Sequence, residues 1–344
     1  MAESEDIFDG HNDSLLRLLD INSPVEAFRD GNDQTHIDMP RLKETDFKAG
    51  MFAIFVPNEN GEYERIETEH GYEYELSDPI TIERAQRMTG QMLVLLNQLT
   101  TNIDSLVQIK TIRDLETLYQ TDNIGAIPHL EGAEPVAPDL SNLDILYAAG
   151  IRSIGPVWSR PNAFGHGVKS RYPGGPDTGP GLTEAGQELI NACADRGILI
   201  DCAHITEQGF WDVVDHTTNP IVVSHSGAYA ISNHSRYLTD EQLDAIADSD
   251  GLVGITFASF GNDGSNDLPP IDRLVDHFEY IRDRIGVEHV AIGSDFDGAS
   301  LPGDIEDVRG LNILIEQLHS RNFTQNEIDQ ITTHNWKRVL DEWW

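Results

Sequence analysis

Short apolar runs alternate with longer amphipathic segments along most of the chain. Runs of about four to eight apolar residues bounded by Gly, Pro or polar residues are typical of buried strands, and apolar residues spaced three and four apart are typical of helices. On this basis we expect strands ending near residue 8 and at 50–56, 125–130, 151–158, 198–201, 221–224, 252–257 and 290–293. We expect helices at 40–48, 80–99, 140–149, 183–196, 206–216, 239–247, 271–285 and 308–318.

This alternation predicts the fold class. About eight strand-then-helix units fit the chain, which indicates an α/β protein with a TIM-like (β/α)₈ barrel as a single domain over residues 1–344. An open doubly wound sheet alternates in the same way, but it normally has a glycine-rich phosphate turn after its first strand. The sequence Asp9-Gly10-His11 is no such turn. Residues 58–78 are a charged insertion, expected as an exposed loop or hairpin.

The charge balance is strongly acidic. The chain of 344 residues has 59 Asp and Glu against 23 Lys and Arg, a formal net charge of −36. Such a surface repels nucleic acid and anionic membranes, so we expect neither as a partner. Lysine is scarce, and concentrated salt would screen the repulsion among so many carboxylates. We therefore predict a halophilic, salt-adapted protein, with an ordinary acidic protein as the alternative.

Localisation follows from features that the sequence lacks. No run of about 18 apolar residues is present, which argues against a membrane-spanning helix. Residues 1–6 lack the basic and apolar character of a signal peptide, and residues 341–344 form no apolar tail for a lipid anchor. Cys193 and Cys202 are too few for a disulfide framework or a thiolate zinc site. We expect a cytoplasmic protein.

Residues suited to binding metal ions gather where the expected strands end. The triplet His11-Asn12-Asp13 follows the first strand, and in an extended segment alternate side chains leave the same face, so both could bind one ion. Barrel enzymes place their chemistry at the carboxyl ends of the strands. The residues that follow other strands are Glu131, His204, His225 and Asp295. Together these side chains supply enough ligands for two divalent ions.

Each of these residues also has a purely structural interpretation. Glu131 could face a helix N-terminus, His204 and His225 could be hydrogen-bonded core imidazoles, and Asp295 could cap a turn. Four unrelated structural roles would then have to coincide at one end of the barrel. The metal site is the simpler interpretation.

Several motifs together resemble the membrane (renal) dipeptidase family of zinc peptidases, which are amidohydrolase-type barrel enzymes. They are Asp9-Gly10-His11-Asn12-Asp13, His129-Leu130-Glu131-Gly132, Asp201-x-Ala203-His204, Ser224-His225-Ser226 and Gly293-Ser294-Asp295-Phe296-Asp297-Gly298, in the family's order and over nearly the whole chain.

The resemblance implies two Zn²⁺ ions per chain. His11 and Asp13 would bind one ion, His204 and His225 the other, and Glu131 would bridge them. Further, Asp295 would be the catalytic carboxylate that handles the proton, and Arg236 would bind the substrate's terminal carboxylate.

The chain also departs from the family pattern. Trp158 stands where vertebrate enzymes have a transition-state histidine, so we place Trp158 in the substrate site and take Arg160, Asn162 and His166 as candidate replacements for that histidine. The segment 334–339 resembles the family's Gly-Asn-Phe-x-Arg-Val, with His334 in place of Gly, and we take it as structural.

The resemblance implies a metal-dependent dipeptidase that cleaves short dipeptides with a di-zinc-activated hydroxide. The alternative is another amidohydrolase on the same scaffold, acting on N-acyl amino acids or lactams. A phosphoesterase for nucleic acid is disfavoured by the acidic surface, and a non-catalytic metal-binding or assembly protein by the retained metal ligands. The partner is then a small dipeptide substrate, and a homodimer is one assembly that the sequence leaves open.

Overall fold

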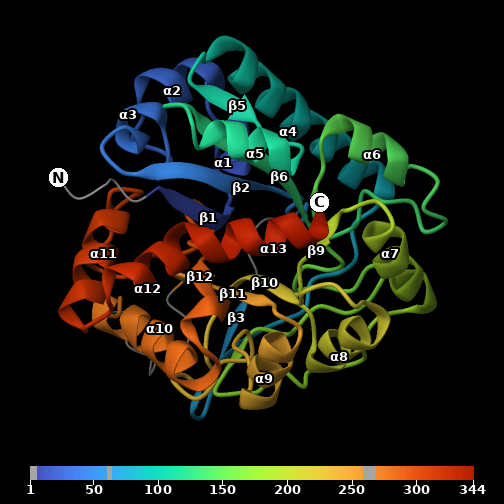
Figure 1. Cartoon of the computed structure of the whole chain (residues 1–344). Coiled ribbons are helices and arrows are strands. Elements are labelled where there is room, and N and C mark those ends of the chain that lie inside the picture. Colours follow the sequence, from blue (N-terminus) through green and yellow to red (C-terminus); the bar gives the residue numbers. More distant parts are fainter. Residues whose placement is uncertain (1–5, 60–63, 259–267) are drawn as a thin grey trace.

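The structure is a computed structural model that describes residues 6–59, 64–258 and 268–344. Helices surround a centre of parallel strands (Figure 1). The strands are β1 (Ile7–Asn12), β2 (Phe47–Phe55), β3 (Arg65–Thr68), β4 (Gly71–Tyr74), β5 (Leu106–Gln108), β6 (Ile124–Glu131), β7 (Ser153–Gly155), β8 (Arg171–Tyr172), β9 (Leu199–Ile200), β10 (Val222–Ser226), β11 (Leu252–Ile255) and β12 (Val290–Ile292).

The helices connect these strands and cover them on the outside. They are α1 (Ser14–Leu19), α2 (Pro24–Asp30), α3 (Met39–Leu42), α4 (Ile82–Asn102), α5 (Ile112–Leu118), α6 (Leu143–Ala149), α7 (Glu184–Ala194), α8 (Glu207–His216), α9 (Asp240–Asp248), α10 (Ile271–Ile285), α11 (Gly310–Ser320), α12 (Gln325–Asp329) and α13 (Asn335–Trp343). A 3₁₀ turn, Val287–His289, precedes β12, and a π-helical turn, Gln330–His334, joins α12 to α13. Within the described ranges, no helix is long and apolar enough to cross a membrane.

Two parallel sheets form the centre. The first has the order β1-β2-β6-β7-β9, with β5 also paired to β6, and the second has the order β10-β11-β12. Single parallel bridges connect their neighbouring edges, Asp201 to Val222 between β9 and β10, and Asn12 to Phe296 between β1 and the residues after β12. The predicted α/β class is thus confirmed as a curled parallel sheet.

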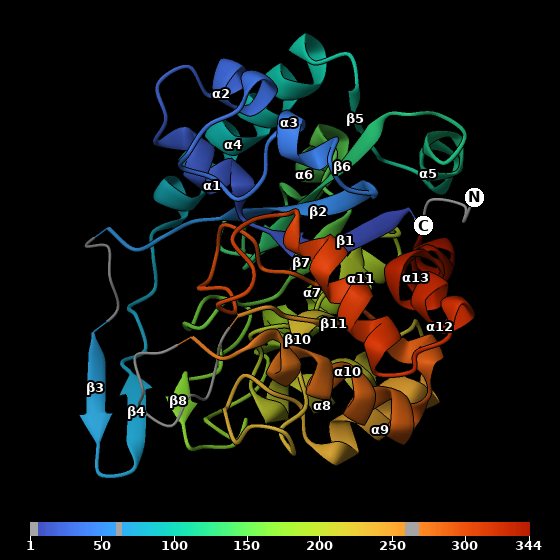
Figure 2. The same cartoon turned by 90° about the vertical axis from the view of Figure 1, so that its left-hand side faces the viewer.

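A small antiparallel sheet lies outside this centre. β3 and β4 form a hairpin, and β4 also pairs with β8. Figure 2 shows the hairpin standing to one side of the helices and parallel strands. The predicted loop or hairpin in the charged insertion is therefore a hairpin as far as the insertion is described, since residues 60–63 lie outside the described residues.

Threonine side chains fix where many helices begin. The hydroxyl at the N-cap accepts a hydrogen bond from a backbone N–H in the first turn, which satisfies a group that the helix itself leaves unpaired. The predicted start at Thr183 is confirmed, and Thr206 caps α8 in the same way. Because α8 begins at Glu207, the stretch from β9 to this cap is short, and His204 lies within it.

One predicted helix is wrong and several elements were not predicted. Residues 40–48 are mostly not helical, because Asp38 caps a single turn, α3, and β2 already begins at Phe47. Lys48 lies in this strand, and its ammonium group donates to the carbonyl of Thr121. The elements that the apolar pattern did not indicate are α1, α2, β5, α5, β8, α12 and α13.

Candidate metal centre and active site

His11 and Glu131 form the middle of a buried polar cluster. His11 lies in β1 and is fully buried, and Glu131 is the last residue of β6. The Nε2 atom of His11 lies 3.5 Å from Oε2 of Glu131 and 3.4 Å from Oδ2 of Asp13. The H-x-D triplet and the glutamate therefore meet in space although they are far apart in the sequence.

His204 and His225 lie near the second carboxylate oxygen of Glu131. Its Oε1 atom is 3.0 Å from Nε2 of His204 and 3.8 Å from Nε2 of His225. The two Nε2 atoms are 2.8 Å apart. Glu131 thus directs one oxygen at His11 and the other at this histidine pair, which is the arrangement that a bridging ligand requires.

The hydrogen bonds around His225 fix its tautomer. The hydroxyl of Ser224 donates to Oδ2 of Asp201 at 2.6 Å, so its oxygen is left to accept the proton on Nδ1 of His225, 2.8 Å away. The Nε2 atom of His225 then carries a lone pair. Hydrogen-bonding the outer ring nitrogen in this way is how proteins orient a metal-binding histidine.

His204 also presents a lone pair at Nε2, because Nη2 of Arg236 donates to that atom at 2.9 Å. Two lone pairs only 2.8 Å apart repel each other unless a cation lies between or beside them. Burial lowers the pKa of both imidazoles well below the usual value, with Arg236 adding to the effect at His204 and His11 at His225. Both rings are therefore neutral, the form that binds metals.

Among the residues that the structure describes, two groups of side chains have ligand atoms within 4.8 Å of one another and could each hold a metal ion. They are His11 with Glu131 and His225, and His11 with Asp13 and Asp295. Both ring nitrogens of His11 and Oδ1 of Asp13 are buried without a hydrogen-bond partner. Buried polar atoms normally have hydrogen-bond partners, so these unpaired atoms are free to bind a metal ion. Burial disfavours a charged His11, but the carboxylates of Glu131 and Asp13 outweigh it and raise its pKa.

Asp295 lies in the turn after β12, beside the same cluster. Its φ of +63° is a left-handed conformation, and the backbone N–H of Asp295 donates to the carbonyl of His11 at 3.0 Å. A Cβ atom on Gly298 would lie 2.2 Å from carboxylate oxygens of both Asp13 and Asp295, so only glycine fits between them. Burial raises the pKa of Asp295 well above its usual value; His11 opposes this shift, while Asp13 adds to it.

Arg236 and Trp158 both border His204. Burial lowers the pKa of Arg236 to about 10, which leaves the guanidinium charged at neutral pH, and Asp295 and Glu131 help to keep that charge. The ring of Trp158 lies with its centroid 5.5 Å from that of His204 and 4.9 Å from that of Phe55. The cluster thus has a buried cation and an indole beside one of its histidines.

The three candidates for the missing histidine are all engaged elsewhere. Arg160 is fully buried, with Nε 2.7 Å from Oε1 of Glu134. Asn162 donates to the carbonyl of Pro156 at 2.9 Å, and Nδ1 of His166 is 3.3 Å from the carbonyl oxygen of Gly181. None of these contacts joins one of the three residues to a candidate metal ligand.

Sequence reasoning missed the residues that hold the candidate ligands in place. Besides Ser224 and Asp201, they include Ser159, whose hydroxyl is 2.9 Å from Nδ1 of His204. Asp9 accepts from the backbone N–H and hydroxyl of Ser294 at 2.8 and 2.9 Å, which ties β1 to the residues after β12. Asp9, Asp201 and Ser224 had a sequence signal, their place near a candidate ligand in the motifs Asp9-x-His11, Asp201-x-x-His204 and Ser224-His225, whereas Ser159 lies in none of these motifs.

A separate groove lies between α5 and α13, with a volume of about 280 Å³. Both acidic and basic side chains line it, so its lining has no single charge sign. Its lining residues are Ile112, Glu116, His334, Lys337, Arg338 and Asp341, none of them a predicted site residue. The histidine and carboxylate cluster therefore remains the candidate active site.

Comparison with known proteins agrees with this geometry. Residues 1–343 match the model of the membrane dipeptidase family, peptidase family M19. The chain belongs to this family. The predicted family and the predicted enzyme class, a metal-dependent dipeptidase, are therefore confirmed.

Individual M19 relatives and neighbours cover most of the chain. A metallo peptidase from Rhodobacter sphaeroides, solved with a phosphinate mimic of the dipeptide L-Ala-D-Ala, superposes with a TM-score of 0.92 at 35% identity, over 99% of this chain and 100% of that chain. An uncharacterised protein from the pqqA 5′ region of Klebsiella pneumoniae is 41% identical over 271 residues, 78% of this chain and 98% of the relative. Dipeptidase aclJ of Aspergillus oryzae is 28% identical over 343 residues, 97% of this chain and 77% of the relative.

Proposed function

We propose that the protein hydrolyses dipeptides at a binuclear zinc centre. His11 and Asp13 would hold one ion, His204 and His225 the other, and Glu131 would bridge the two. The observation that carries this proposal is the position of Glu131, whose two oxygens lie 3.5 Å from Nε2 of His11 and 3.0 Å from Nε2 of His204. Imidazoles and carboxylates are ligands that zinc prefers in catalytic sites.

When bound, two zinc ions would lower the pKa of a shared water and polarise a peptide carbonyl. The protein's own residues would do the rest. Asp295 would accept a proton and return it to the leaving amine, and its burial-raised pKa suits a group that must exist in both states. Arg236 would bind the substrate's terminal carboxylate through its charged guanidinium, and Trp158 would form a wall of the substrate site.

A free carboxylate one residue from the scissile bond marks cleavage next to the C-terminus. If Arg236 binds that carboxylate, the peptide bond beside it lies at the candidate metal ligands, and in a dipeptide this is the only peptide bond. The Rhodobacter sphaeroides structure, 35% identical, holds a phosphinate mimic of L-Ala-D-Ala, which supports acceptance of a D-residue at the C-terminal position. We therefore expect L,D-dipeptides as substrates together with L,L-dipeptides.

We also infer that residues 1–344 form one domain in which the two parallel sheets close into a (β/α)₈ barrel. The single bridges between β9 and β10 and between β1 and the residues after β12 support this closure. The closed ring would bring the carboxyl ends of β1, β6, β9, β10 and β12 together around the metal ligands. A homodimer is one assembly that the sequence leaves open, and light scattering would test it.

The test combines metal analysis with a substrate panel. We expect close to two zinc ions per chain after loading, and hydrolysis of Ala-Ala and Gly-D-Ala that is lost with a chelator. Glu131→Gln should lower the zinc content and abolish hydrolysis, whereas Glu116→Gln, in the distant groove, should change neither. A wild-type protein that holds two zinc ions but cleaves no dipeptide, or a Glu131→Gln variant with full zinc content and full activity, would contradict the proposal.

A further inference from the structure

The turn that carries Asp295 has an unusual backbone. Asp295 and Asp297 have φ angles of +63° and +69°, in the left-handed region that residues other than glycine seldom adopt. Such conformations persist where the surrounding contacts hold them. The turn also supports the H-x-D segment, because the backbone N–H of Asp13 donates to the carbonyl of Phe296 at 2.8 Å.

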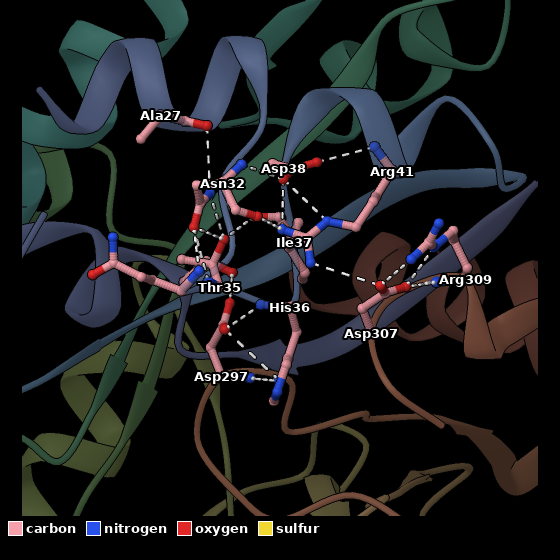
Figure 3. A network of polar contacts seen from close by, with 12 residues as sticks. Ala27, Asn32, Thr35, His36, Ile37, Asp38, Arg41, Asp297, Asp307 and Arg309 are labelled. Carbon is pink, nitrogen blue, oxygen red and sulfur yellow. Dashed lines mark hydrogen bonds and ion pairs between the residues drawn. The ribbon is translucent and has the colours of Figure 1, made fainter. Parts of the chain in front are cut away.

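His36 holds this turn through two hydrogen bonds with Asp297. The backbone N–H of Asp297 donates to Nδ1 of His36 at 2.8 Å, and the backbone N–H of His36 donates to Oδ1 of Asp297 at 2.6 Å. Figure 3 shows both contacts at the lower end of the polar network. The side chain of His36 is 32% exposed, so it fills no core position that would by itself explain a histidine there.

Asp297 is held from a second direction by α1, the helix that follows Asp13. The hydroxyl of Ser14 donates to Oδ2 of Asp297 at 2.7 Å, and Nε of Arg17 donates to its carbonyl at 2.7 Å. Asp297 therefore connects the start of α1, which follows Asp13, to the turn that carries Asp295. His36 is the further residue that hydrogen-bonds Asp297.

The segment of His36 is anchored independently of the turn. Oδ1 of Asn32 accepts the backbone N–H groups of Gln34 and Thr35 at 2.8 and 2.9 Å. Arg41 donates from Nε to Oδ2 of Asp38 at 3.0 Å and from Nη2 to the carbonyl of Asn32 at 3.0 Å. These contacts surround the segment in Figure 3. His36 is thus fixed well enough to hold another element in place.

The direction of the hydrogen bond fixes the tautomer of His36. Nδ1 of His36 also lies 3.8 Å from Oδ1 of Asp297, a contact that would be an ion pair only if Nδ1 carried a proton. The amide of Asp297 already donates to Nδ1, so that nitrogen is the acceptor and the ring is neutral. Burial lowers the pKa of His36 despite the nearby Asp297 carboxylate, which agrees with this assignment.

We propose that His36 is a positioning residue that sets the Asp295 carboxylate relative to Asp13 by accepting a hydrogen bond from the amide of Asp297. The proposal rests on the proposed role of Asp295 as the carboxylate that moves the proton. His36 reaches the reacting atoms only through Asp297. A misplaced Asp295 slows the chemical step more than it weakens dipeptide binding, since substrate contacts such as that of Arg236 are untouched.

Three variants separate positioning from general stability. His36→Leu removes the acceptor, while His36→Asn can restore one because its Oδ1 stands at the position of Nδ1. Arg309→Gln is the matched control, since Arg309 pairs with Asp307 at the outer edge of the network and does not contact Asp297. For each variant we would measure kcat, KM, zinc content and amide hydrogen exchange of the peptide that contains residue 297.

We expect His36→Leu to lower kcat by about 10- to 100-fold, with KM within about twofold of wild type, and to speed exchange of the Asp297 amide. His36→Asn should recover most of kcat and protection, and Arg309→Gln should match wild type in both. Wild-type kcat in His36→Leu, or an equal loss in His36→Leu and His36→Asn, would overturn the proposal. If wild type itself cleaves no dipeptide, the proposed function fails. Unchanged hydrogen exchange of the Asp297 amide in His36→Leu would independently refute the role of the hydrogen bond between His36 and Asp297.

Discussion

Replacing Arg236 tests the central claim about substrate recognition. The guanidinium is buried and charged, and Nη2 donates to Nε2 of His204 at 2.9 Å, so it lies beside the candidate metal ligands. A charge-assisted hydrogen bond contributes about 1.5–3 kcal/mol. Arg236→Ala should therefore lower kcat/KM for Ala-Ala by roughly 10- to 150-fold. Arg236→Lys should lose less, because it keeps the charge but not the two-point contact.

The assay compares two free dipeptides with the C-terminal amide of one of them. Kinetics of Ala-Ala, Gly-D-Ala and the amide Ala-Ala-NH₂ would be measured with wild type and Arg236→Ala, together with zinc content. The expected loss falls on the free acids, and the amide should be a poor substrate for both proteins. Equal rates on acid and amide in wild type would refute the carboxylate contact and favour a general amidohydrolase. A loss of zinc in Arg236→Ala would instead assign the effect to the metal centre.

Three further predictions concern salt, ligand orientation and a buried ion pair. Melting temperatures should rise from low to molar KCl, because screening relieves repulsion in a chain of net charge −36, and equal values would reject salt adaptation. Asp201→Asn presents an amide to Ser224 and so reverses the hydrogen bond to His225, which should weaken zinc binding by about 10- to 100-fold in a competition titration. Arg160→Ala leaves Glu134 buried without its 2.7 Å partner and should cost about 3–5 kcal/mol of unfolding free energy, measured by denaturant titration.

The sequence predicted those helices and strands in which apolar residues recur at a clear spacing. It failed to predict elements without such a spacing. α10, Ile271–Ile285, has the predicted bounds, because its apolar residues recur at helical spacing and a glycine follows its last residue. β9 is only Leu199–Ile200, although the apolar run is longer, since sheet pairing rather than hydrophobicity ends a strand. α1 and α2 are short helices of six and seven residues, too short for a clear period.

The candidate ligands could be proposed from the sequence because their residue types are themselves informative. A histidine or carboxylate at the end of several strands is unusual enough to suggest a common site, and the structure brings His11, Asp13, Glu131, His204 and His225 together. Ser159 and Ser224 could not be found in this way. Serine is common at surfaces and turns. These two serines matter because the Ser159 hydroxyl lies 2.9 Å from Nδ1 of His204 and the Ser224 hydroxyl lies 2.8 Å from Nδ1 of His225. That contact depends on tertiary packing, which spacing along the chain does not encode.

The electrostatics of the cluster predict a strong effect of metal on stability. Burial raises the pKa of Glu131 and of Asp295, and in both cases the neighbouring Asp13 adds to the shift, so like charges are held together at a cost. Divalent cations bound only by the folded protein would offset that cost and stabilise it by about 4 kcal/mol for each site filled at 1,000 times its dissociation constant.

For a chain of this length the entropy of unfolding is about 0.7 kcal/mol/K, so each filled site should raise the melting temperature by about 6 °C. We would record calorimetric melting curves of zinc-loaded and chelator-treated protein in molar KCl, where screening reduces the contribution of surface charge. His225→Ala should show a smaller difference between the two states than wild type, because it lacks a ligand of one site. Equal melting temperatures with and without zinc in the wild-type protein would mean that cations do not relieve repulsion among these carboxylates. The proposal of a binuclear centre would then be rejected.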